Sequence, residues 1–191
     1  MHAEAPGTGE GLFYEDTLPL VWREIETPPT AARLVNVYHA NEQLLRYLAA
    51  LEEHRADHLE EDHPQTAHEL ARLDLKINLL LEMVGHLLSR QAVLPDAVPL
   101  RLGADGLQWT AKESQVPAAG SHLGVDVYLN SKYPAPLTLF GKVASAKPVS
   151  GGHAVDLVYT DMDESLRTAL EKMIFRQHRR LVAHVRRSGK S

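Results

Sequence analysis

The 191-residue sequence contains no cysteine. This absence excludes disulfide bonds, thiolate metal ligands and a cysteine nucleophile together, and it favours a cytoplasmic protein. Residues 1–11 lack a basic region followed by an apolar one, so no secretory leader is expected. The apolar runs are far shorter than the roughly 20 residues that span a bilayer, and membrane insertion is therefore not expected.

Positive charge is also scarce. The chain has 20 Lys and Arg against 25 Asp and Glu, a formal net charge of −5 that supplies no overall attraction for nucleic acid. Only the C-terminus is locally basic, with Arg176, Arg179 and Arg180. We interpret these cations as complements to a helix dipole, although nucleic-acid binding through this segment is an alternative.

Glycine is absent from residues 29–84, and proline interrupts residues 30–90 only at Pro64. In two stretches, apolar residues recur at alternating spacings of three and four, which predicts two long helices with heptad seams inside residues 28–92. The first seam comprises Leu34, Val37, Asn41, Leu44, Leu48 and Leu51, and the second comprises Leu70, Leu73, Ile77, Leu80, Val84 and Leu87.

Such seams stabilise a helix only against a partner, and the second helix also carries apolar residues off the seam, among them Leu79 and Met83. We therefore expect the chain to form a homo-oligomer through these helices, a tetramer rather than a dimer. Asn41, a polar residue inside the first seam, would fix the register between helices. The alternative is that the helices cover the chain's own sheet.

From about residue 97 the pattern changes to short alternating runs separated by turn residues. Strands are predicted over residues 98–102, 106–111, 123–129, 137–144 and 153–159, in addition to an earlier one over 18–24. Asp161 or Asp163 would then cap a last helix. The sequence thus predicts an α+β protein built on a small antiparallel β-barrel.

Several segments resemble the PilZ domain of bacteria, best known as a receptor for cyclic di-GMP. They are the turn over residues 102–109, the strands ending near Val143 and Tyr159, and the closing helix over 169–180. Residues 14–22 resemble the start of the atypical class, in which a long helical region follows the first strand. The resemblance implies one atypical PilZ domain over residues 1–191, with a first strand within 1–27, a helical insertion at 28–92, and barrel and closing helix at 97–187.

The chain departs from the PilZ pattern where that family binds the dinucleotide. The family uses Arg-x-x-x-Arg before the first strand and Asp/Asn-x-Ser-x-x-Gly at a turn, because guanidinium groups bind phosphates bidentately. The turn motif maps onto residues 101–106, where Arg101 replaces the acid or amide, Gly103 replaces the serine and Gly106 alone is retained. Glu15 lies in the segment before the first strand, where the family has its paired arginines for binding the phosphates. Cyclic di-GMP is therefore not expected to bind by the standard motifs; a receptor using other residues is the alternative.

No pairing of nucleophile and base is evident, so neither an enzyme nor a cofactor is expected. His54 and His58 have the i, i+4 spacing of metal ligands, but a solvated, titrating turn is the simpler interpretation, and no metal is expected. The PilZ resemblance then implies a bacterial signalling or scaffold protein that acts through an unidentified protein partner in motility, surface behaviour or virulence regulation.

Overall fold

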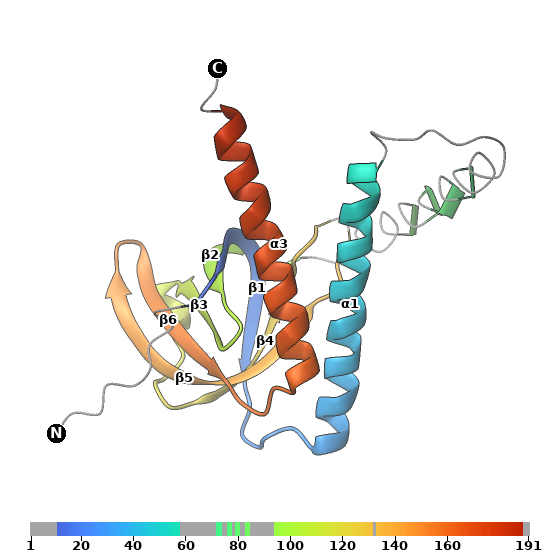
Figure 1. Cartoon of the computed structure of the whole chain (residues 1–191). Helices are drawn as coiled ribbons and strands as arrows, with labels where there is room; N and C mark the ends of the chain where they lie inside the picture. The colour runs from blue at the N-terminus through green and yellow to red at the C-terminus, as the bar shows by residue number, and fades with distance from the viewer. Residues whose placement is uncertain are drawn as a thin grey trace.

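The computed structural model describes residues 11–57, 94–131 and 133–188, together with eight helical residues between 72 and 84. Six strands form a closed antiparallel barrel in the order β1-β2-β3-β6-β5-β4 (Figure 1). The strands are β1 (Tyr14–Glu24), β2 (Ala97–Leu102), β3 (Gly106–Ala111), β4 (His122–Val127), β5 (Leu137–Val149) and β6 (Gly152–Tyr159).

β1 closes the barrel because it changes partner along its length. Residues 14–19 pair with β2, and residues 20–24 pair with β4. Its alternating pattern turns Leu18 and Leu20 into a core that also contains Trp109, which is 2% exposed. The sequence predicted an antiparallel barrel correctly, but it placed the start of β1 four residues too late, at residue 18.

β3 and the turn before it follow the sequence pattern closely, whereas β5 extends five residues beyond the predicted end. The register between β5 and β6 shifts between Val143 and Ser145, and this irregularity hides the alternation beyond it. The two strands are joined by a turn at Gly151 and Gly152, both of which have positive φ.

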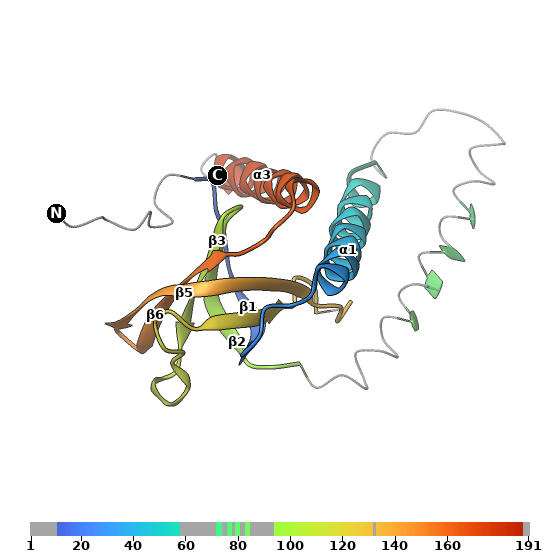
Figure 2. The ribbon, with the colours of Figure 1, turned by 90° about the horizontal axis from the view of Figure 1, so that it is seen from below.

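Two long helices lie against the barrel, α1 (Ala31–Asp57) and α3 (Glu164–Ser188). They run in the same direction, contact each other and cover one side of the sheet (Figures 1 and 2). The side chain of Thr30 accepts the Arg33 N–H at 3.4 Å at the start of α1. Asp163, rather than Asp161, caps α3 by accepting the Leu166 N–H at 2.8 Å.

α1 packs into the fold of its own chain along much of the predicted seam. Leu44 of the seam is buried in the core, together with Tyr38 and Leu45, which lie off the seam. Three further seam residues are partly buried and pack against the same core: Leu34, Val37 and Leu48. Leu51 is half-buried. In the structure, therefore, α1 covers the barrel of its own chain, which was the alternative interpretation of its apolar seam.

Asn41 attaches α1 to the barrel. It is 2% exposed; its amide nitrogen donates to the carbonyl of Thr138 at 2.7 Å, and its amide oxygen accepts the Thr138 N–H at 3.0 Å. Both polar groups of this side chain are thus used within one chain. The sequence predicted that Asn41 fixes the register between helices, but its hydrogen bonds to Thr138 already account for the burial of its side chain.

Tyr38 ties the same helix to the start of α3. Its hydroxyl donates to the carbonyl of Asp161 at 2.7 Å. Burial, together with the nearby carboxylates of Asp161 and Asp163, raises the pKa of Tyr38 to about 12. Asp161 itself has a φ of 56°, an uncommon conformation for a residue with a side chain, and the contact with Tyr38 helps to hold it.

We predict that Gly141→Ala destabilises the barrel. A Cβ at this position would lie 2.5 Å from the Val158 carbonyl oxygen and 2.8 Å from Cγ of Leu157, so the strands would have to move apart. The free energy of unfolding should fall by about 1–3 kcal/mol in urea titrations. Gly11→Ala, where nothing lies within 4 Å, is the matched control and should change it by less than about 0.5 kcal/mol.

We also predict that Asn41→Ala lowers the free energy of unfolding by about 2–3 kcal/mol, because the Thr138 N–H and carbonyl lose their partner on α1. Asn36→Ala, at an exposed position of the same helix, is the control and should be nearly neutral. Equal, small effects for both variants would show that Asn41 does not hold α1 to the barrel.

Candidate functional site

The turn between β2 and β3 occupies the position of the degenerate nucleotide motif. The Gly103 N–H donates to the Gly106 carbonyl at 2.9 Å, which closes the turn. Asp105 lies at its tip, where its carboxylate pairs with Arg167 of α3 and its carbonyl accepts the Tyr159 N–H at 3.0 Å. The turn is therefore tied to both β6 and α3.

Phe13 fills the space beside this turn. A Cβ on Gly103 would lie 3.0 Å from Cε1 of Phe13, so a serine here, as in the PilZ turn motif, would require the ring to move. Gly103 itself is buried. The small residue at the serine position thus makes room for an aromatic ring from the segment before β1.

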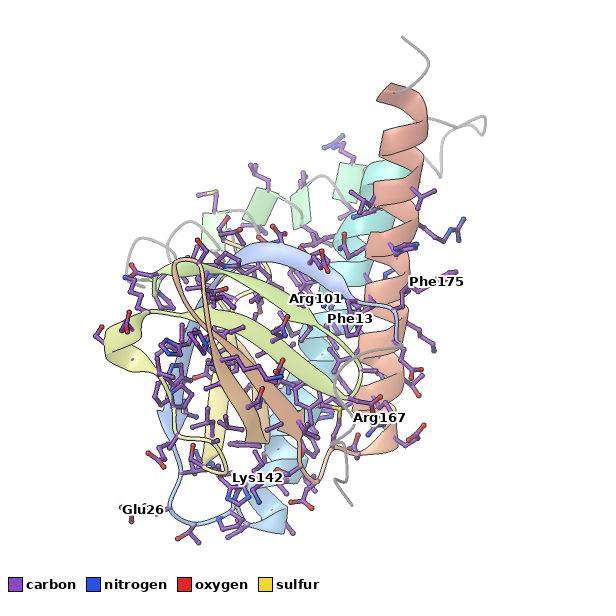
Figure 3. All side chains as sticks on the ribbon, turned by 90° about the vertical axis from the view of Figure 1, so that its left-hand side faces the viewer. Phe13, Glu26, Arg101, Lys142, Arg167 and Phe175 are labelled. Carbon is purple, nitrogen blue, oxygen red and sulfur yellow. The ribbon has the colours of Figure 1, made fainter. Side chains whose placement is uncertain are left out.

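Arg101 is the cation nearest in sequence to the turn, and it is engaged on two sides. Its guanidinium carbon lies 4.5 Å from the centre of the Phe13 ring, and its Nε lies 2.6 Å from Oε1 of Glu15 (Figure 3). Both charged side chains are largely exposed, so the ion pair contributes little to stability. It does neutralise the guanidinium that could otherwise bind a phosphate.

Arg101, Gly103 and Gly106, the degenerate motif positions, lie at this turn, and the ring of Phe13, which the sequence pattern did not single out, lies beside it. Phe13 gave no signal of its own, because nothing in its sequence context points to Gly103. Glycine in place of serine was the only indication that another group takes the space.

The Arg-x-x-x-Arg pattern of residues 176 and 180 lies on α3 and not before β1, and both arginines interact within the chain. Their neighbour Arg179 stands over the exposed ring of Phe175, 5.9 Å from its centre.

A second candidate site is the set of helical residues described between 72 and 84, which we call the outer helical residues. They lie beyond α1 on the side away from α3 (Figures 1 and 2). Six of them are apolar and 49–61% exposed: Leu73, Ile77, Leu79, Leu80, Met83 and Val84. Single exposed apolar residues are ordinary, whereas six within twelve positions make these residues a candidate surface for association.

Some predicted positions lie outside the described residues. They include Leu70 and Leu87 of the second seam and the side chains of His54 and His58. Within the described residues, no group of three or more histidine, aspartate or glutamate side chains could hold a metal ion. No helix among the described residues is both long and apolar enough to cross a bilayer.

Comparison with solved structures shows the same fold elsewhere. A tetrameric PilZ domain from Xanthomonas campestris, described as a pathogenic protein self-assembled through an unusual helical bundle, matches with a TM-score of 0.74. It is 22% identical, and the match covers 93% of each chain. The Bacillus subtilis inhibitor of motility MotI/DgrA matches 43% of this chain and 41% of its own, at 15% identity and a TM-score of 0.36, too low to support an argument.

A search of curated proteins found no match to the sequence. The family model described as "Atypical PilZ domain, cyclic di-GMP receptor" matches residues 45–187, about three quarters of the chain. This range includes the second half of α1, five of the six strands and nearly all of α3. The barrel, the turn and the long helices thus have a common explanation: this chain belongs to the atypical PilZ domain family.

Proposed function

We propose that this PilZ chain is a non-catalytic signalling or scaffold protein that does not bind cyclic di-GMP by the standard motifs, and that it acts through protein contacts. The observation that carries the proposal is Phe13, whose ring takes the space beside Gly103. A ligand entering the turn would have to displace this ring and separate Arg101 from Glu15.

Electrostatics support the same proposal. A carboxylate facing a phosphate at 4 Å near a protein surface costs up to about 4 kcal/mol, and less where solvent screens it as it does around Glu15. The chain therefore combines a neutralised cation, an acid and a filled space where the family's ligand needs guanidinium groups. A receptor that uses other residues is the competing proposal, and the description of the family supports it.

We propose further that the chain self-associates through the outer helical residues, as a tetramer rather than a dimer. Burying a fully exposed apolar side chain of this size contributes about 1.5–3 kcal/mol, and these six, which are 49–61% exposed, would each contribute roughly half of that to association. The fold shared with a tetrameric PilZ domain that assembles through a helical bundle supports this reading. Leu70 and Leu87 belong to the proposed surface, whereas most α1 seam positions already contact the chain's own core.

In this proposal the helices set how many barrels are assembled, and each barrel offers a surface to another protein. We propose motility, surface behaviour or virulence regulation as the process, which the resemblance to PilZ domains implies. The lack of cysteine makes the cytoplasm the compartment we propose.

Titration calorimetry tests the first part. With cyclic di-GMP at tens of micromolar we expect no saturable heat, because Arg101, the cation beside the turn, is already paired with Glu15. A PilZ domain with both motifs intact, titrated in parallel, shows that the ligand is active. Saturable heat at one ligand per chain would replace our proposal with the receptor that uses other residues.

Light scattering tests the second part. Leu80 is 61% exposed, and Leu80→Asp would place a charge within the apolar surface, so the variant should have a lower molar mass than the parent. Val35→Asp is the matched control, because Val35 is 66% exposed on α1 and lies off the predicted seam; it should leave the mass unchanged. A parent that is monomeric at high micromolar concentration would refute self-association.

A further inference from the structure

At the end of the barrel opposite the degenerate turn, β1 has one open edge. Its pairing with β2 stops at Pro19 and Ala97, and the last bond on this side runs from the Leu20 N–H to the carbonyl of Asp96 at 3.3 Å. Pro95 precedes Asp96 and has no N–H to donate, so β2 does not continue along β1.

The backbone groups on this edge can be assigned from the alternation of an antiparallel pair. The Ile25 N–H donates to the His122 carbonyl at 2.9 Å, so odd-numbered residues at this end of β1 face β4. Trp22 and Glu24 consequently direct their N–H and carbonyl groups to the opposite side. Within the part of the chain that the structure describes, no backbone group pairs with them there.

A cavity of about 530 Å³ lies beside this edge, within the size range of ligand pockets. Residues of β1, β2 and β3 and of the loop after β3 line it, among them Trp22, Trp109, Val98 and Val116. An open strand edge and a recess lined by both apolar and polar side chains are therefore next to each other.

The charges at the cavity are balanced. Among the described residues that line it, the ionisable ones are Lys112 and Asp96, which form an ion pair of 2.6 Å. The hydrogen bond from Lys112, with its charge, lowers the pKa of Asp96. This lining suits an uncharged apolar group better than a phosphate or a carboxylate.

We propose that an extended segment of a partner protein adds to the barrel at the open edge of β1 and places an apolar side chain in the cavity. The segment would pair with Trp22 and Glu24 as an added strand, in the position beside β1 that β2 no longer occupies before Pro95. A helix has no unpaired backbone groups in its middle for such an edge, which is why we assign an extended peptide. This inference rests on the proposed function only in taking a protein as the partner.

Random linear dodecapeptides displayed on phage and panned on the full chain provide the probe. We expect enriched peptides to alternate apolar and polar residues and, once synthesised, to bind saturably. Trp22 and Trp109 are the only tryptophans of the chain and both line the cavity, so binding should shift the intrinsic fluorescence. Methylating alternate peptide nitrogens should weaken binding at least about tenfold, because pairing needs those donors.

Two variants at Glu24 distinguish the contribution of its backbone N–H to peptide binding from that of its side chain. Glu24→Pro removes the N–H that faces the open side without removing a bond to β4, and it should weaken binding about tenfold. Glu24→Ala keeps the N–H and should stay within about twofold of the parent. Circular dichroism checks that both variants fold. If Glu24→Pro does not fold, the comparison of methylated and unmethylated peptides on the parent protein still tests the backbone pairing.

No enriched peptide, an unchanged fluorescence, or equal affinity for the parent and Glu24→Pro would each overturn the inference. A synthetic peptide with the sequence of residues 85–93 that binds as tightly as the selected peptides would also overturn it, since the edge would then bind a segment of the chain itself. None of these results bears on the molar mass or the cyclic di-GMP titration, so failure here is distinguishable from failure of the proposed function.

Discussion

The division of β1 between two partners is the constraint on which both ends of the barrel depend. Its first half pairs with β2, which brings the preceding Phe13 against the turn at Gly103. Its second half pairs with β4, which closes the barrel and leaves the other edge of that half without β2. The course of this one strand thus places Phe13 beside Gly103 at one end of the barrel and leaves an edge without β2 at the opposite end.

The sequence predicted most of the barrel because each strand alternates between core and solvent over a short range. β3 matched its predicted bounds, since turn residues precede it and the alternation runs through Trp109. The prediction ended β5 too early because the register shift at Val143 and Ser145 breaks the period, and Pro148 does not suggest a strand.

The helices show a different limit. A heptad pattern records that one face of a helix is apolar, but it does not identify what covers that face. For α1 the cover is the chain's own barrel and α3, and Asn41 finds its partner 97 residues away in the backbone of Thr138. A contact between a side chain and a distant backbone leaves no periodic trace, and the same is true of Phe13 and Gly103. The outer helical residues share the pattern yet stay exposed.

The attachments of α1 have a consequence for signalling geometry. Asn41 joins the helix to β5, and Tyr38 joins it to the loop that leads into α3, which in turn holds the turn between β2 and β3 through Arg167 and Asp105. The helix is therefore attached to the barrel at two separate points. We expect a force that displaces α1 to move the barrel with it, so that the orientation of the barrel follows that of the helix.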